Sequence, residues 1–216
     1  MPDPIPSPGA EPPVETIFRD HARPWLIAGL ILIALALIGG LTARPVYQAY
    51  KVRRGLERAG DVARAMSAND LKAAAANLRM AITLAPGEPE VWRVAGRFCA
   101  RVGNPDGLEY WQRLAQVPDF SLAERLEFAE FAQRLGRVDL VARQLPVLLA
   151  SPKPEPRMWR VAVVHHRRSG DEVAAAETAR RWLAQDPAEE EVQLILGEIL
   201  LSHPDARARA EGNPSG

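Results

Sequence analysis

Three arginines, Arg93, Arg97 and Arg101, follow one another at intervals of four residues. Because an α-helix turns once in about 3.6 residues, this spacing places their guanidinium groups in one stripe along a helix face. A guanidinium group donates paired hydrogen bonds to a carboxylate, so the stripe could bind acidic protein segments or the carboxylate at a chain end. Two other interpretations stay open. Arginine also favours helix formation on a solvated face, and it binds anionic lipid headgroups or nucleic acid.

The other residues that could do chemistry form no catalytic or metal-binding pattern. The sequence lacks the glycine-rich phosphate-binding motifs and the zinc-binding His-Glu-x-x-His motif. His165 and His166 are adjacent, so on a helix their side chains diverge by about 100° and are poorly placed to hold one metal ion. Cys99 is the only cysteine, which excludes an internal disulfide. We therefore expect no enzymatic activity, no cofactor and no metal site.

The helix that carries the arginine stripe is expected to belong to a series of repeated helix pairs. Gly103, Gly136 and Gly170 are 33 and 34 residues apart, and a helix-length segment precedes and follows each of them. The expected first helices cover 91–101, 122–135 and 157–168, and the second helices cover 105–116, 138–149 and 171–185. Each helix pair is too small to bury its apolar face alone, so neighbouring pairs should stack on one another.

Helix pairs with this period resemble the tetratricopeptide repeat (TPR). The family pattern asks for a large residue early in the first helix, small residues where helices cross, and glycine in the turn. The residues of this chain that match it for packing are Trp92, Gly96, Ala115, Trp159 and Ala175. The middle unit matches least well, because Arg125 stands where the large residue is expected. The resemblance implies an all-α fold in which the pairs stack into a right-handed α-solenoid.

The resemblance also implies a concave groove lined by the first helices of the pairs. The arginines carried onto that groove are Arg93, Arg97, Arg101, Arg134, Arg157, Arg160, Arg167 and Arg168. Family members that clamp a chain-terminal carboxylate pair basic residues with asparagines, which this chain lacks there, so acidic segments within a protein are the better match. Nearby carboxylates could neutralise part of the stripe. They belong to Glu109, Glu124, Glu127 and Glu130.

An apolar segment near the N-terminus predicts a membrane anchor. The twenty residues 24–43 carry no charge, and a helix of that length covers roughly 30 Å, the thickness of the bilayer's hydrocarbon core. Trp25 stands at one edge, and Tyr47 and Tyr50 lie just beyond the other, where amphipathic rings favour the membrane interface. A cleaved signal peptide and a buried core helix are the competing interpretations.

The charges beside this segment predict its orientation. Two basic residues, Arg19 and Arg23, lie close before it, and five lie close after it, between 44 and 58. Positive residues resist translocation, so this difference favours a repeat domain in the cytoplasm and a single-pass protein of the bacterial inner membrane. A periplasmic repeat domain is the alternative.

Together these features predict a membrane-anchored scaffold that binds proteins or peptides, in bacterial cell-envelope or membrane-complex assembly. Lys+Arg and Asp+Glu both number 27, so the net charge of zero supports no nucleic-acid partner. An alternative is the N-terminal anchoring part of a larger envelope enzyme. The expected parts are a disordered proline-rich leader (1–23), a transmembrane helix (24–43) that contacts the bilayer, a juxtamembrane helix (44–69), TPR-like repeats (70–203) and a tail (204–216). The repeat units are 55–88 (partial), 89–121, 122–155, 156–189 and 190–205 (incomplete).

Overall fold

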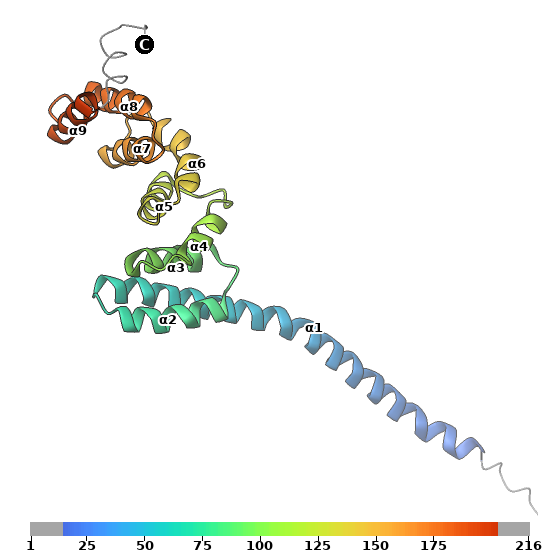
Figure 1. Cartoon of the computed structure of the whole chain (residues 1–216). Coiled ribbons are helices and arrows are strands. Elements are labelled where there is room, and N and C mark those ends of the chain that lie inside the picture. Colours follow the sequence, from blue (N-terminus) through green and yellow to red (C-terminus); the bar gives the residue numbers. More distant parts are fainter. Residues whose placement is uncertain (1–14, 203–216) are drawn as a thin grey trace, which may run out of the picture. The chain divides into compact units, whose positions relative to one another are not determined.

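The computed structural model describes residues 15–202, apart from the side chains of residues 15–24, 26, 36 and 38–42. The described residues form nine α-helices and no strand (Figure 1). This confirms the predicted all-α class. The helices are α1 (Glu15–Ser67), α2 (Leu71–Leu84), α3 (Pro89–Val102), α4 (Gly107–Leu114), α5 (Leu122–Arg134), α6 (Val138–Leu149), α7 (Pro156–Arg168), α8 (Glu172–Gln185) and α9 (Glu190–Ser202).

The chain divides into two compact units, with the boundary inside α1 between Arg53 and Arg54. In the second unit, α3 packs on α4, α5 on α6 and α7 on α8, and these three pairs follow one another in chain order (Figure 1). α5 also packs directly on α7, so first helices of successive pairs touch. This arrangement is that of a TPR-like helical repeat.

Three glycines end the first helices of the pairs. Gly103, Gly136 and Gly170 have φ angles of 73°, 70° and 76°, in the left-handed region that a side chain disfavours. Each follows α3, α5 or α7 within two residues and turns the chain into the next helix. The same glycine turn therefore occurs three times, and its recurrence produces the spacing of 33 and 34 residues.

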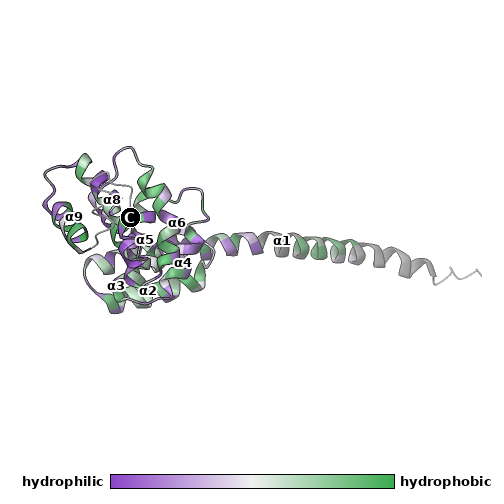
Figure 2. Cartoon of the chain, turned by 45° about the horizontal axis from the view of Figure 1, so that its top comes forward, coloured by the Kyte–Doolittle hydropathy of each residue, from purple (hydrophilic) through white to green (hydrophobic). Residues whose placement is uncertain are grey.

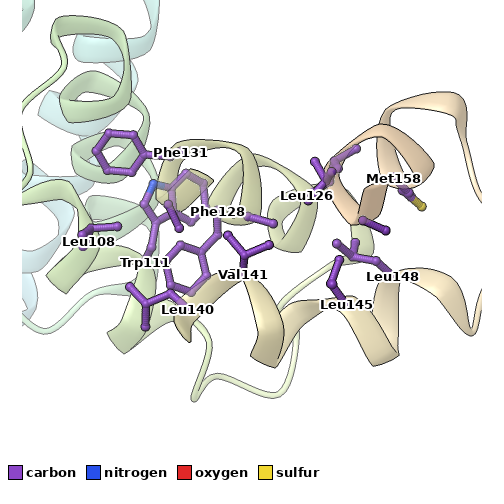
Figure 3. Close-up of a cluster of buried hydrophobic side chains, with 14 of the residues drawn as sticks. Leu108, Trp111, Leu126, Phe128, Phe131, Leu140, Val141, Leu145, Leu148 and Met158 are labelled. Carbon is purple, nitrogen blue, oxygen red and sulfur yellow. The ribbon is translucent and has the colours of Figure 1, made fainter. Parts of the chain in front are cut away.

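The apolar core of the second unit consists of three clusters of buried side chains. The largest extends from α4 to α7, and within it the ring of Trp111 stacks on Phe128 with centroids 6.2 Å apart (Figure 3). A second cluster joins the end of α1 to α2 and α3. The third joins α7, α8 and α9. Each cluster draws on more than one helix pair, as expected where a single pair cannot bury its own apolar face.

α1 corrects the predicted division of the N-terminal region. It is one helix of 53 residues that passes through the predicted boundary at 43/44 and through Pro45. It begins at Glu15, so residues 15–23 of the predicted disordered leader are helical. Residues 1–14 of that leader and the predicted tail 204–216 lie outside the described residues.

The predicted single-pass membrane localisation is wrong. Within residues 15–202, the helices with described side chains include none that is long and apolar enough to cross a bilayer. Residues 27–35 form a hydrophobic stretch of α1. Figure 2 shows this hydrophobic stretch on α1, followed along the chain by a hydrophilic one. The cytoplasmic orientation and the bilayer contact predicted for 24–43 depended on that anchor and lose their basis.

The end of α1 provides a matched test of how tightly it packs on the repeats. A Cβ added at Gly55 would lie 2.4 Å from the Cβ of Ala85, whereas one added at Gly60 meets nothing within 4 Å. We expect Gly55→Ala to lower the free energy of unfolding by about 2 kcal/mol through overpacking. Gly60→Ala should raise it by up to about 1 kcal/mol through helix propensity. Urea unfolding of both variants measures the difference, and equal stabilisation by both would contradict this contact.

Candidate protein-binding groove

Arg93 in α3 lies at the centre of a network that joins two helix pairs. Its Nε donates to Glu124 Oε1 at 2.6 Å, its Nη2 to Asp119 Oδ2 at 2.9 Å and its Nη1 to Glu90 Oε2 at 3.2 Å. Glu124 is only 6% exposed. It also closes a capping box at the start of α5, because it accepts hydrogen bonds from the Ser121 backbone N–H and hydroxyl. Each of the three guanidinium nitrogens of Arg93 therefore already donates to a carboxylate, as expected of a structural residue.

The pKa values of this pair follow from the same hydrogen bonds. Burial alone would lower the pKa of Arg93, but its hydrogen bonds to Glu124, Asp119 and Glu90 outweigh burial and hold the pKa above its ordinary value. Burial alone would raise the pKa of Glu124, yet the hydrogen bonds from Ser121 and Arg93 hold it below its ordinary value. Both groups are therefore charged at neutral pH.

Four more arginines of the predicted groove also pair with carboxylates of a neighbouring repeat. Their guanidinium groups donate two hydrogen bonds to one carboxylate, which raises the pKa of each arginine above its ordinary value. The pairs are Arg97–Glu127, Arg157–Glu130, Arg160–Glu191 and Arg167–Glu198. Of the carboxylates predicted to neutralise the stripe, Glu124, Glu127 and Glu130 do so, whereas Glu109 pairs with Arg113. Glu191 and Glu198 were not predicted. The resulting ladder links successive first helices.

The last three predicted arginines behave differently. Arg101, Arg134 and Arg168 are exposed, and within residues 15–202 none of them forms an ion pair. Each donates instead to a neutral oxygen of the preceding repeat. The acceptors are Asn69 Oδ1 for Arg101 at 3.2 Å, the Ala100 carbonyl for Arg134 at 3.4 Å, and the Gln133 carbonyl for Arg168. These three arginines therefore keep most of their donors available.

A cavity of about 360 Å³ opens between α3 and α5 on the face that the resemblance assigns to the groove. Two of the arginines without an ion pair, Arg101 and Arg134, line it together. The complete lining is Arg97, Ala100, Arg101, Trp111, Glu127, Glu130 and Arg134. Of the other predicted groove arginines, Arg167 and Arg168 line a separate cavity of about 310 Å³. The predicted groove residues are thus brought together in groups and not as one continuous lining.

The residues predicted to pack the repeats differ in how deeply they are buried. Gly96, Trp159 and Ala175 are buried, whereas Trp92 and Ala115 are half-buried. The sequence pattern missed Trp111, which is 1% exposed and lies against Gly96. A Cβ at Gly96 would come within 2.8 Å of the Trp111 ring, so the glycine makes room for the tryptophan that borders the cavity. A glycine inside one expected helix and a large aromatic residue in the next are both visible in the sequence. Together they could have identified Trp111 as a core residue.

No cluster of three His, Cys, Asp or Glu residues that could hold a metal ion is present in the described part of the chain. His165 and His166 lie with their rings 5.4 Å apart and nearly perpendicular. Burial, together with the neighbouring His166, lowers the pKa of His165. This histidine pair is therefore a packed feature of α7.

Two solved structures share this arrangement of helices. PilF of Pseudomonas aeruginosa aligns with a TM-score of 0.53 at 12% identity, over 81% of this chain and 79% of that one. PilW, described as a widely conserved type IV pilus biogenesis factor, aligns with a TM-score of 0.52 at 16% identity, over 94% of this chain and 89% of that one. The likeness shows the fold. No family profile and no curated protein sequence matches the chain.

Proposed function

We propose that this chain is a protein-interaction scaffold that takes part in assembling a cell-envelope complex and binds acidic protein segments in the groove between α3 and α5. The observation that carries the proposal is the cavity there, with Arg101 and Arg134 both in its lining and without an ion pair in the described residues. Exposed guanidinium groups in a concave surface bind carboxylates by paired hydrogen bonds.

The place of the scaffold in envelope assembly is inferred from its structural neighbours. PilW, described as a type IV pilus biogenesis factor, shares the fold over most of both chains. A solenoid of helix pairs offers an extended surface for binding other proteins. No catalytic role is part of this proposal, and both glutamates in the cavity lining are held in ion pairs by Arg97 and Arg157.

Site-specific crosslinking in the source bacterium tests the proposal with the full chain. A photoreactive amino acid in place of Ala100, which lines the cavity, should capture one or a few proteins with acidic segments that belong to an envelope complex. The same amino acid in place of Gln112, an exposed residue that lines a different cavity beside α6, should not capture them. Deleting the gene should also reduce the amount of the assembled complex.

Two results would contradict the proposal. One is an identical set of crosslinked proteins from positions 100 and 112, which would show that the groove confers no selectivity. The other is capture of RNA or lipid alone from position 100, which would support the binding of polyanions.

A further inference from the structure

Arg101 and Arg134 occupy the same place in successive repeats. Each lies two residues before a turn glycine, Gly103 or Gly136, and they are 33 residues apart. Stacked repeats place equivalent positions side by side, which explains why both residues line one cavity. Their present hydrogen bonds, at 3.2 and 3.4 Å, go to neutral oxygens. A carboxylate oxygen is a stronger acceptor for a guanidinium group than these.

The two carboxylates in the cavity lining are already paired. Glu127 accepts hydrogen bonds from Arg97 at 2.8 and 3.2 Å. Glu130 accepts hydrogen bonds from Arg157 of the next repeat at 2.9 and 2.6 Å. The charge of Arg101 and Arg134 is therefore not cancelled by an ion pair within the described residues, and the cavity retains two positive groups for a ligand.

The same carboxylates limit which anion fits. A dianion such as a phosphate would bring a second negative charge close to Glu127 and Glu130, which like-charge repulsion opposes. A carboxylate carries one charge and two oxygens that match two guanidinium groups. Trp111 also lines the cavity, and its buried indole N–H has no acceptor among the described residues. This N–H is buried against Gly96 and is not exposed to the cavity, so Trp111 borders the subsite as an apolar wall.

We propose that the cavity between α3 and α5 is a subsite for one aspartate or glutamate side chain of a partner protein, held by Arg101 and Arg134. The subsite rests on the proposed function, because it specifies how the groove binds an acidic segment. Arg97 is excluded from direct binding, since its guanidinium group is held by Glu127. On α3, Arg101 therefore belongs to the subsite, whereas Arg97 belongs to the ladder of ion pairs between repeats.

A titration of the full chain with short peptides tests the subsite. The probe is acetyl-Gly-Glu-Glu-Gly-amide, whose blocked ends leave only side-chain carboxylates, and the comparison probe has glutamine in place of glutamate. Arginine Nε–H signals observed by NMR should shift for Arg101 and Arg134 with the glutamate peptide only. Arg101→Gln and Arg134→Gln should each weaken its binding about tenfold, the effect of losing one charge-assisted contact. Inorganic phosphate should compete weakly.

Arg168→Gln is the matched control. Arg168 has the same place in the next repeat and also donates to a carbonyl of the preceding one, but it does not line this cavity. Its substitution removes the same charge and should leave peptide binding unchanged. Equal weakening by Arg168→Gln would show general charge attraction and overturn the subsite. Phosphate binding that is tighter than that of the glutamate peptide would also overturn it.

The outcomes separate the subsite from the proposed function. If crosslinking from position 100 captures envelope proteins while the glutamate peptide does not shift Arg101 or Arg134, the groove binds proteins and the subsite is wrong. If the peptide binds through both arginines and no protein is captured from position 100, the subsite is right and the scaffold proposal fails.

Discussion

Replacing Arg93 by methionine is expected to lower the free energy of unfolding by about 3 kcal/mol. Methionine keeps most of the side-chain volume but leaves the carboxylate of Glu124, which is 6% exposed, without its guanidinium partner. Breaking a buried ion pair by removing one partner is costly, because the remaining charge stays buried. For a repeat domain of this size the loss corresponds to a fall of roughly 6–12 °C in the melting temperature.

The control for this variant is Arg97→Met on the same helix. Arg97 and Glu127 form an equivalent pair between repeats, but their side chains are 43% and 36% exposed. Solvent screens such a pair, so its loss should cost less than about 1 kcal/mol. Thermal unfolding followed by circular dichroism compares the two variants. Similar effects of both would show that the Arg93 network is no more buried than the rest of the ladder.

The pH dependence of stability gives a second measurement of the same pair. The folded protein holds the pKa of Glu124 below its ordinary value. A depressed carboxyl pKa stabilises the fold fully above the unfolded pKa of about 4.5, and this contribution is lost as the pH falls through the folded pKa. The stability difference between the unmodified chain and Arg93→Met should therefore shrink below about pH 4. A difference that stays constant down to pH 2 would contradict the role of the ionised pair.

Replacing Trp111 by alanine should lower the free energy of unfolding by about 4 kcal/mol. Trp111 is 1% exposed, stacks on Phe128 and belongs to the largest buried cluster (Figure 3). Its removal leaves a large void between α4 and α5, and the surrounding side chains can fill it only in part. The cavity beside α3 should widen as well, because the indole is part of its lining.

Trp92→Ala is the comparison for this variant. Trp92 occupies the position that the repeat pattern reserves for a large residue, yet it is half-buried, and its indole N–H donates to the Pro86 carbonyl at 2.8 Å. Its truncation should cost about half as much as that of Trp111, since less apolar surface is lost. Urea unfolding of both variants decides the order. If Trp92→Ala lowers the free energy of unfolding more than Trp111→Ala does, the position favoured by the sequence pattern contributes more to stability than Trp111.

Much of the fold could be predicted because its signals are local. The turn glycines, the helix lengths and the apolar periodicity all act within one helix pair, so their spacing of 33 and 34 residues was visible in the sequence. The first helices of the three pairs agree with the expected ranges to within two residues at each end. The second helices agree equally well, and the largest difference is at α4, which is two residues shorter at each end than the expected 105–116. The loop after α4 contains Asp119, which accepts a hydrogen bond from Arg93.

The predicted anchor failed for a different reason. Absence of charge over 24–43 suggested a membrane span, but among the helices with described side chains none is long and apolar enough to cross a bilayer. Trp111 was missed because its importance depends on Gly96 in another helix. That contact joins two helices, so no single helix-length window of the sequence contains it.

By itself the sequence determined the repeat, the arginine-rich first helices and the turns between them, since these depend on helix geometry over one or two turns. Only the tertiary structure decided what each arginine does. Arg93 and Arg97 pair with carboxylates 31 and 30 residues further along the chain, respectively. Arg101 and Arg134 share a cavity and form no ion pair within the described residues. The difference lies in which side chains the neighbouring repeat presents, because an arginine is available to a partner only where no neighbouring carboxylate pairs with it.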